Sequence, residues 1–371
     1  MSETFVTMRG PLGSGARAII ARAAGADARA RAALRTAIDD AFLAPDARLD
    51  DRTRATLGAL IATLTSAIEG ELREHAGRLL TTRGEGGLAD LMAFEAPPVV
   101  ERLAAAGLLR DMDFIGECVS RIRAEMIGAA LPFAASDPDS ASLLARLAQS
   151  SDRVVAGAAA AVMAGESQRR AAADGGSLPG TGLPAPLHAR LLWWVAAAMR
   201  ERLAEDAGER LPALDRAIAE AALRNLAMRD DNDRLEAAAM RLAAAIDAQG
   251  DELPALFDEA LRDRRVALFA ALLGHALGVS YELARELVID PAGDRLWLAL
   301  RALEMPRDLI ARIGFLLCEA DPRRDVEIFA DTLEIIVAVD AEAARVAVAP
   351  LRLHPDYRAA LLALDARAPR R

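Results

Sequence analysis

The second half of the chain repeats one local pattern, in which an aspartate heads an apolar-periodic segment. The intervals between these aspartates are about thirty-one residues, and a fixed period of that order is typical of stacked helical repeats. Aspartate suits the head of a helix because its carboxylate accepts hydrogen bonds from the free N–H groups of the first turn. We therefore expect a helix to begin at each of Asp233, Asp263, Asp294, Asp325 and Asp356.

A second helix is expected between each pair of these segments. Leu253–Leu261, Tyr281–Ile289 and Arg307–Glu319 combine helical spacing with boundaries made by glycine or proline. Proline is tolerated in a first helical turn but not in a helix interior, so it marks the boundaries. Two helices per unit, stacked on like units, make a HEAT-like α-solenoid of helical hairpins. The alternative is an irregular bundle in which the aspartates coincide by chance.

Composition supports the all-α fold class. Hydrophobic residues make up 53% of the 371 residues, aromatic residues only 4%. Most of the hydrophobic residues are alanine and leucine, the strongest apolar helix formers. The β-branched and aromatic residues that favour strands are sparse.

The helical periodicity stops in one internal segment. Residues 165–186 become rich in glycine, proline and serine, which predicts a linker or long surface loop. We expect a disordered N-terminus over residues 1–15 and an irregular N-terminal helical region over residues 16–164. Residues 187–371 would then form the C-terminal helical-repeat region.

The charged residues exclude several kinds of chemistry. The formal net charge is −10, so general attraction to the DNA backbone is not expected. All 45 basic side chains other than histidine are arginine. A chain without lysine has no phosphate-loop lysine, no kinase-type lysine, no Schiff-base lysine and no Ser-x-x-Lys pair.

The sequence shows no catalytic, cofactor-binding or metal-ligating pattern. A metal site needs several converging ligands, and no histidine lies at helical spacing from another histidine or a cysteine. Cys118 and Cys318 lie far apart in apolar segments, so we expect small buried hydrophobes rather than a disulfide or metal pair. We therefore expect a non-enzymatic protein with no cofactor. The histidines are His75, His188, His275 and His354.

The sequence also predicts a cytoplasmic protein without a transmembrane segment. Its N-terminus lacks the apolar core of a signal peptide. The longest weakly polar stretch, Val266–Tyr281, is shorter than a membrane span and is better explained as a buried helix.

Five arginines in two turns are candidate protein-binding residues. Arg323 and Arg324 lie in the turn Asp-Pro-Arg-Arg-Asp, and three more arginines occupy the equivalent turn two units earlier. Stacked repeats would align these turns on one edge, where guanidinium groups could bind a partner carboxylate or phosphate. The alternative is a pair of capped turns with solvated arginines. The three arginines of the earlier turn are Arg262, Arg264 and Arg265.

Trp193 and Trp194 are further candidates for protein binding. Adjacent side chains on a helix point about 100° apart, so one ring can enter the core while the other lies near the groove between the two halves of the chain. The alternative is that both rings pack in the core.

Several stretches resemble a bacterial family known as domain of unknown function 2336. They are LPAPLHARLLWWVAAAMRERL, SYELARELVIDP and DRLWLALRALEMPRDLIARIGFLLCEADPRRDVEIFADTLEIIVAV. The resemblance covers most of residues 100–340 and is clearest in the second half. It implies a helical-repeat protein without an assigned activity, and it supplies no catalytic residue.

These observations favour a scaffold or regulator that binds an unidentified protein partner on an extended helical surface. Self-association also fits alanine-rich helical faces that pack closely. One alternative is a HEAT-like nucleic-acid-binding enzyme of the base-excision type, which the acidic balance opposes. Another is docking on a membrane surface through an amphipathic helix such as Arg17–Leu43.

Overall fold

The computed structural model describes residues 48–93, 97–132, 141–173 and 181–365. All regular elements in these ranges are helical, and no strand occurs in them, so the predicted all-α class is confirmed. The described residues from Arg52 onwards belong to one compact unit. The predictions for residues 1–15 and for the amphipathic segment Arg17–Leu43 lie outside the described ranges.

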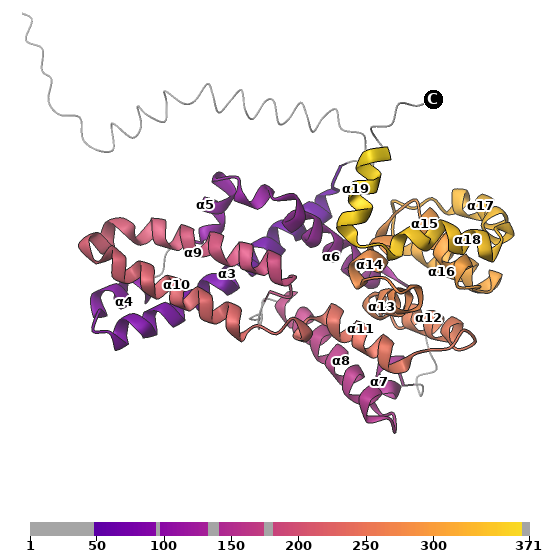
Figure 1. The fold of residues 1–371 in the computed structure, drawn as a ribbon, viewed down its shortest axis with the longest axis horizontal. Coiled ribbons are helices and arrows are strands. Elements are labelled where there is room, and N and C mark those ends of the chain that lie inside the picture. Colours follow the sequence, from indigo (N-terminus) through magenta and orange to yellow (C-terminus); the bar gives the residue numbers. More distant parts are fainter. Residues whose placement is uncertain (1–47, 94–96, 133–140, 174–180, 366–371) are drawn as a thin grey trace, which may run out of the picture. The chain divides into compact units, whose positions relative to one another are not determined.

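The helices follow one another closely along the chain (Figure 1). They are α3 (Asp51–Thr82), α4 (Gly86–Ala93), α5 (Val99–Ala105), η2 (Leu108–Arg110), α6 (Met112–Ala130), α7 (Leu143–Ala148), α8 (Arg153–Ala173), α9 (Ala185–Ala207), η3 (Gly208–Arg210), α10 (Leu211–Met228), η4 (Asp231–Asp233), α11 (Leu235–Ile246), α12 (Leu253–Arg262), α13 (Val266–Leu277), α14 (Tyr281–Ile289), α15 (Asp294–Ala302), α16 (Arg307–Ala320), α17 (Val326–Ala338), α18 (Ala341–Val348), η5 (Ala349–Arg352) and α19 (Pro355–Asp365).

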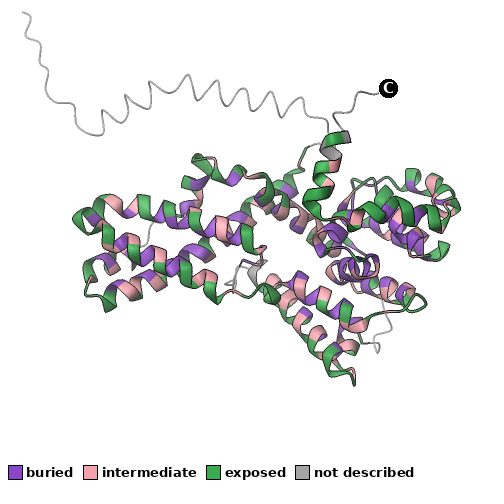
Figure 2. Cartoon of the chain, in the orientation of Figure 1, coloured by how far each residue is buried: buried purple, intermediate pink, exposed green. Residues whose placement is uncertain are grey.

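A first hydrophobic core joins α3 to the hairpin of α9 and α10, with α4 and α5 beside them. On α3 the buried apolar residues recur three or four positions apart, which places them on one face of the helix. Leu64, Ile68 and Leu72 on that face are at most 1% exposed. Figure 2 shows this alternation of buried and exposed faces along α3, α9 and α10. Full burial of each such side chain contributes about 1.5–3 kcal/mol.

A second hydrophobic core contains α7, α8 and the helices from α11 to α18. Its centre is α13, where nearly every apolar side chain is buried. The helix ends at Gly278, whose φ of 66° lies in the left-handed region that glycine adopts without strain. Gly274 lets α14 approach closely, because a Cβ atom there would lie 3.2 Å from Cβ of Ala284.

The two regions predicted on either side of residues 165–186 are interleaved. Helix α6 contributes Phe114 and Cys118 to the first core and Ile127 and Leu131 to the second. The chain then returns to the first core with α9 and α10, after α7 and α8 have joined the second. The predicted linker begins too early, because α8 continues to Ala173. Alanine and arginine hold residues 165–173 in the helix, and the glycine-rich part follows.

The structure confirms a helix start at Asp294, the first residue of α15, but it corrects the expectation of an aspartate N-cap at four of the five positions. Only Asp325 is an N-cap, and it accepts hydrogen bonds from the backbone N–H groups of Glu327 and Ile328. Asp233 ends η4, and Asp294 and Asp356 lie within their first turns. Asp263 instead follows α12 and accepts a 2.6 Å hydrogen bond from the N–H of Leu143, at the start of α7. The period therefore locates the helices correctly but not their caps.

The intervening helices agree closely with the prediction. Helix α14 spans Tyr281–Ile289 as expected, while α12 and α16 each end one residue later than expected. Helix α11 packs on both α8 and α13, as stacked hairpins would, but α15 packs mainly on α18. The arrangement of these hairpins as a solenoid stays a prediction.

No single described helix is long and apolar enough to cross a membrane. Helices α13 and α14 together pass the same test by length and composition, but the break between them bends by 117°.

An aromatic cluster in the second core depends on the absence of a side chain at Gly314. The ring of Phe329 lies 4.9 Å from Trp297 and 5.4 Å from Phe315, measured between centroids. A Cβ atom on Gly314 would lie 1.9 Å from Cζ of Phe329. We therefore predict that Gly314→Ala lowers the free energy of unfolding by about 1–3 kcal/mol, because the ring must move out of the cluster.

Urea unfolding of the full chain measures this effect, and Gly116→Ala is the matched control. Gly116 is also in a helix interior, but a Cβ atom there meets nothing within 4 Å. The control should gain about 0.5–1 kcal/mol from the higher helix propensity of alanine. Equal stability of the two variants would contradict the proposed role of Gly314.

Candidate functional site

A short strap, Thr181–Leu183, lies within the predicted linker just before α9 and is fixed by three arginines. Arg121 of α6 donates to the first of its carbonyl oxygens at 3.2 Å, and Arg234 donates to the second at 3.1 Å. Arg229, which follows α10, donates to the third. Each arginine comes from a different element, so the strap holds α6, α10 and α11 together. Backbone carbonyls that no helix satisfies are paired here with charged donors.

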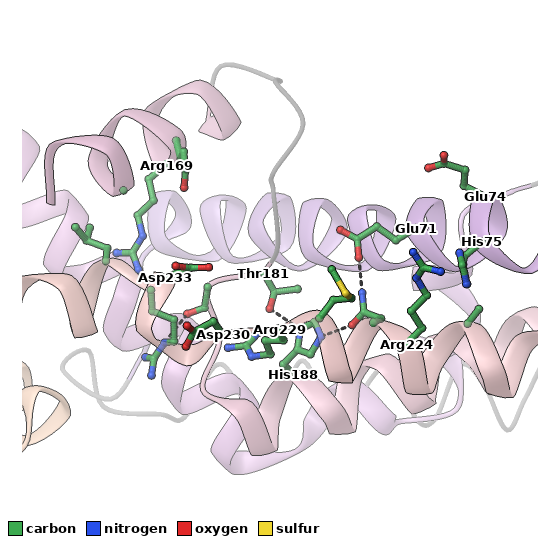
Figure 3. Close-up of a pocket in the computed structure, with 18 of the residues that line it drawn as sticks. Glu71, Glu74, His75, Arg169, Thr181, His188, Arg224, Arg229, Asp230 and Asp233 are labelled. Atoms are coloured by element: carbon green, nitrogen blue, oxygen red, sulfur yellow. Dashed lines mark hydrogen bonds between the residues drawn. The ribbon is translucent and has the colours of Figure 1, made fainter. Parts of the chain in front are cut away.

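A hydrogen-bonded chain of four side chains runs from the strap to α3 (Figure 3). Nδ1 of His188 lies 2.8 Å from the Thr181 hydroxyl, and Nε2 lies 2.7 Å from Oδ1 of Asn225. The amide of Asn225 donates in turn to Glu71. An amide oxygen only accepts hydrogen bonds, so Nε2 of His188 carries the proton and Nδ1 accepts from the hydroxyl. Burial lowers the pKa of His188 and favours this neutral form.

The Thr181, His188 and Asn225 side chains have the spacing of a nucleophile, a base and an orienting group. However, Thr181 is only 1% exposed, and its hydroxyl also accepts a hydrogen bond from the N–H of Leu183. A substrate carbonyl has no access to this hydroxyl in the described arrangement. The chain of hydrogen bonds therefore positions the strap and α9 rather than presenting a nucleophile.

A cavity of about 460 Å³, here called the polar pocket, lies between α3, α8, α10 and the strap. Figure 3 shows His75 and Arg224 at one end of it and Arg169 and Asp233 towards the other, with His188 between them. At the α3 end, Asn225 hydrogen-bonds to Glu71, whose pKa is nevertheless raised, chiefly by burial. The size is within the usual range for small-molecule sites, about 300–1,000 Å³.

An ion network with little exposure lies beneath the strap end of the polar pocket. Arg169 of α8 pairs with Glu236 of α11 and lies 3.6 Å from Glu125 of α6. The Glu236 side chain is 3% exposed. Burial opposes its ionisation, but Arg169 and Arg234 outweigh burial and hold the pKa of Glu236 at about 2. Glu236 is therefore charged, and its charge is matched by two guanidinium groups.

The same network continues from α14 to α6. Arg285 donates two hydrogen bonds to the Glu117 carboxylate, at 3.0 and 2.6 Å, and both side chains are buried. The guanidinium carbon of Arg285 also lies 5.8 Å from the ring centroid of Tyr281. Burial raises the pKa of the Tyr281 phenol, so this ring stays neutral.

The predicted tryptophan pair lines a second depression, here called the tryptophan groove. It has a volume of about 570 Å³ and lies along α9, between α5 with η2 on one side and α10 on the other. Trp193 is 42% exposed, whereas Trp194 packs edge-on against Phe114 with centroids 6.0 Å apart. The structure therefore gives the first of the two predicted alternatives, in which one ring enters the core and the other lies in a groove.

The arginines of the earlier predicted turn have separate partners. Arg262 pairs with Asp258 of its own helix at 2.6 Å. Arg264, whose backbone φ is 59°, is likewise not without an interaction partner. Arg265 pairs with Glu166 of α8 and is partly buried. This turn thus binds α8 rather than presenting three unpaired guanidinium groups.

The arginines of the later turn cap α14. Arg324 is buried and donates a 2.6 Å hydrogen bond to the carbonyl of Val288, and its guanidinium carbon lies 5.9 Å from the ring centroid of Trp297. Burial lowers the pKa of Arg324. Arg323 donates to the carbonyl of Ile289 at 3.0 Å and to both carboxylate oxygens of Asp321. Arg324 was a candidate for partner binding, but its buried guanidinium group has no exposed donor to offer a partner.

The other chemically notable side chains do not converge. No group of three or more His, Cys, Asp or Glu side chains that could hold a metal ion occurs in the described part of the chain. Cys118 is buried as expected, and burial raises the pKa of its thiol to about 12. Cys318 is only partly buried.

Sequence reasoning missed most of the residues around the polar pocket. Asn225 and Glu71 are 154 positions apart, and Arg285 and Glu117 are 168 apart. No local spacing connects such residues. The one sequence signal is the Thr-Gly-Leu-Pro stretch before α9, which lies within the predicted linker.

All of these features belong to an all-helical protein with two cores and a strap between them. The family model described as an uncharacterised protein conserved in bacteria (DUF2336) matches residues 137–349, which is more than half of the chain. The chain therefore belongs to this family. No curated protein and no solved structure gives a significant match.

The ion network predicts a pH-dependent stability. Glu236→Gln should lower the free energy of unfolding at pH 7 by about 3–5 kcal/mol, because it leaves buried arginines without their countercharge. The native pKa of Glu236 is about 2, below the ordinary value of 4.5. Its contribution is therefore complete above pH 4.5 and is lost as the pH falls towards 2. The difference between wild type and variant should shrink in that range.

Urea unfolding at a series of pH values measures this difference. Glu282→Gln is the matched control, because Glu282 is 41% exposed and lies 3.6 Å from Arg234. An exposed pair of this kind is worth at most about 1 kcal/mol. A Glu236→Gln variant as stable as the control at pH 7 would show that the network contributes little.

The hydrogen-bonded chain predicts the protonation of His188. At pH 6.5 the ring should be mostly neutral and protonated at Nε2. Asn225→Asp places a carboxylate beside Nε2 and should raise the histidine pKa by about 1–3 units. Thr181→Val removes a neutral partner and should leave the ring neutral. Nitrogen NMR of the imidazole across a pH series measures the pKa and the protonated nitrogen of His188 in the wild type and in both variants. A mostly charged ring in the wild type at pH 6.5 would contradict the assigned donors and acceptors.

Proposed function

We propose that this protein is a non-enzymatic helical-repeat adaptor that acts in the cytoplasm and binds a protein partner in the tryptophan groove. The observation that carries the proposal is the exposure of Trp193 above the packed ring of Trp194. Tryptophan and arginine are the residues most enriched among those that dominate binding energies in protein interfaces. A large ring that is held on a rigid helix loses little conformational entropy when a partner covers it.

The surroundings of Trp193 support a helical partner segment. Ala197 follows one turn later on α9, lines the same groove and is exposed, so it leaves room beside the ring. Leu108 of η2 adds an apolar side chain that is 37% exposed. An amphipathic helix with apolar residues at positions i and i+4 would place them against these side chains.

Ion pairs on both sides of the groove would orient such a segment. Arg102 makes two hydrogen bonds to the carboxylate of Glu201, at 2.7 and 2.8 Å, and Arg200 pairs with Asp215 at 3.0 Å. All four side chains are roughly half exposed. An apolar strip between charged rims is the usual anatomy of a protein interface. The rims offer both signs of charge, so a partner helix with mixed charges fits them.

Photo-crosslinking from the groove tests this proposal. A photoreactive amino acid at position 197 should capture a partner in cells of the source bacterium. Adding Trp193→Ala should weaken the binding of that partner about thirtyfold or more, as truncation of a central interface tryptophan does. Tyr357→Ala is the matched control, because Tyr357 is another exposed aromatic residue and lies outside the groove.

The proposal fails if the crosslinker captures no protein, or if Trp193→Ala and Tyr357→Ala bind the captured protein equally well. Circular dichroism of both variants checks that each one is folded. Purified partner and full-length protein then give the dissociation constants.

A further inference from the structure

One end of the polar pocket gathers basic side chains from two helices. His75 and Arg78 of α3 and Arg224 of α10 line this end. Within the described part of the chain, no hydrogen bond or ion pair joins Arg224 to another residue. Figure 3 shows the Arg224 side chain directed towards His75 across the gap between the two helices. Like charges from two elements are therefore placed together in a cavity.

The carboxylates at this end are already occupied. Glu74 pairs with Arg78 on the same helix, and Glu71 accepts the amide of Asn225. Arg78 also lies within hydrogen-bond distance of Nδ1 of His75, at 3.2 Å. Burial, Arg224 and Arg78, in that order, lower the pKa of His75, which favours its neutral form. Like charges cost free energy when they are brought together, and an anion between them would remove that cost. Two guanidinium groups and an imidazole are suited to phosphate oxygens.

The opposite end of the same cavity carries hydrogen-bond acceptors. Asp230 and Asp233 line it, and both residues are exposed. One carboxylate oxygen of Asp230 accepts the N–H of Asn232, which leaves the other oxygen for a ligand. The Asp233 carboxylate has no hydrogen-bond partner among the described residues. If a phosphate occupied the basic end, these carboxylates would accept hydrogen bonds from hydroxyl groups elsewhere on the same ligand.

Apolar side chains also line the cavity. Ala221 and Met228 of α10 and Leu235 of α11 all contribute to the wall. Met228 is 74% exposed, and its flexible thioether adapts to the shape of a ligand. The cavity thus offers basic side chains at one end, carboxylate acceptors at the other, and apolar side chains in its wall.

We propose that the polar pocket binds a small phosphorylated metabolite with hydroxyl groups. The phosphate lies between His75, Arg78 and Arg224, and hydroxyl groups of the ligand donate to Asp230 and Asp233. A sugar phosphate and a nucleoside monophosphate share this chemistry, and they differ in whether a base covers the apolar side chains of the wall. The site is separate from the tryptophan groove, so it does not depend on the adaptor function.

Isothermal titration of the full-length protein tests the proposal with five probes. They are inorganic phosphate, ribose 5-phosphate, AMP, adenosine and ribose. The phosphorylated probes should bind in a saturable way, and adenosine and ribose should not. Ribose 5-phosphate or AMP should bind more tightly than inorganic phosphate, because only these two reach the acceptor end. A further gain for AMP over ribose 5-phosphate would identify a nucleotide, and its absence would identify a sugar phosphate.

Three variants assign the contacts. Arg224→Gln should weaken every phosphorylated probe by about tenfold or more, as loss of a charge-assisted hydrogen bond does. Asp233→Asn should weaken ribose 5-phosphate and AMP but leave inorganic phosphate unchanged. Arg216→Gln is the matched control, because Arg216 is an exposed arginine of the same helix that does not line the pocket. It should bind all probes as the wild type does.

Three results would overturn the proposal. The first is the absence of saturable binding by every phosphorylated probe. The second is an equal affinity of Arg224→Gln and Arg216→Gln for these probes. The third is inorganic phosphate binding as tightly as both larger probes. Thermal unfolding of each variant shows whether it is folded, and Arg224 is suited to the test because its replacement breaks no hydrogen bond described here.

Discussion

Arginines that donate to backbone carbonyls are the interaction on which this structure depends most. The last carbonyls of a helix have no partner within the helix, and here arginines from other elements satisfy them. Arg352 donates to the carbonyl of Leu277 at the end of α13, and Arg301 donates to Val339 after α17. The later predicted turn does the same for α14, and three arginines hold the strap. A guanidinium group suits this role because it has five donors in a fixed plane, and the chain has no lysine to compete for it.

This interaction explains how the part of the chain from Arg52 onwards, with two hydrophobic cores, forms one compact unit. Apolar burial stabilises each core but has no direction, whereas hydrogen bonds to particular carbonyls fix how helices meet. The strap shows the consequence, because its three carbonyls bring α6, α10 and α11 to the same place. The ion pair of Arg285 with Glu117 adds a second connection between α14 and α6. Such pairs are costly to break once formed, since removing one partner leaves an uncompensated buried charge.

The sequence predicted the local structure well and the long-range contacts poorly, for a physical reason. Apolar spacing and proline positions are local, so the bounds of α14 were predicted to the residue. Whether an aspartate caps a helix depends on which N–H group donates to its carboxylate. The Asp263 carboxylate accepts from the N–H of Leu143 on α7, which lies 120 residues earlier in the chain. The tryptophan pair could be assigned because neighbouring side chains on a helix must diverge. Which residues meet across the polar pocket is decided by the packing of α3 against α10, and no period in the sequence encodes that packing.

The hairpin of α9 and α10 carries parts of both candidate sites. On α9, His188 lines the polar pocket and Trp193 lines the tryptophan groove, and on α10 the same is true of Arg224 and Asp215. The two sites therefore share one pair of helices, each of which buries one face in the first core. A ligand that changed how α9 packs on α10 would act on both sites, and linkage requires the effect to be equal in both directions. A rigid hairpin would instead keep the sites independent. Leu191, Val195 and Met199 of α9 are fully buried in the first core, which favours the rigid case.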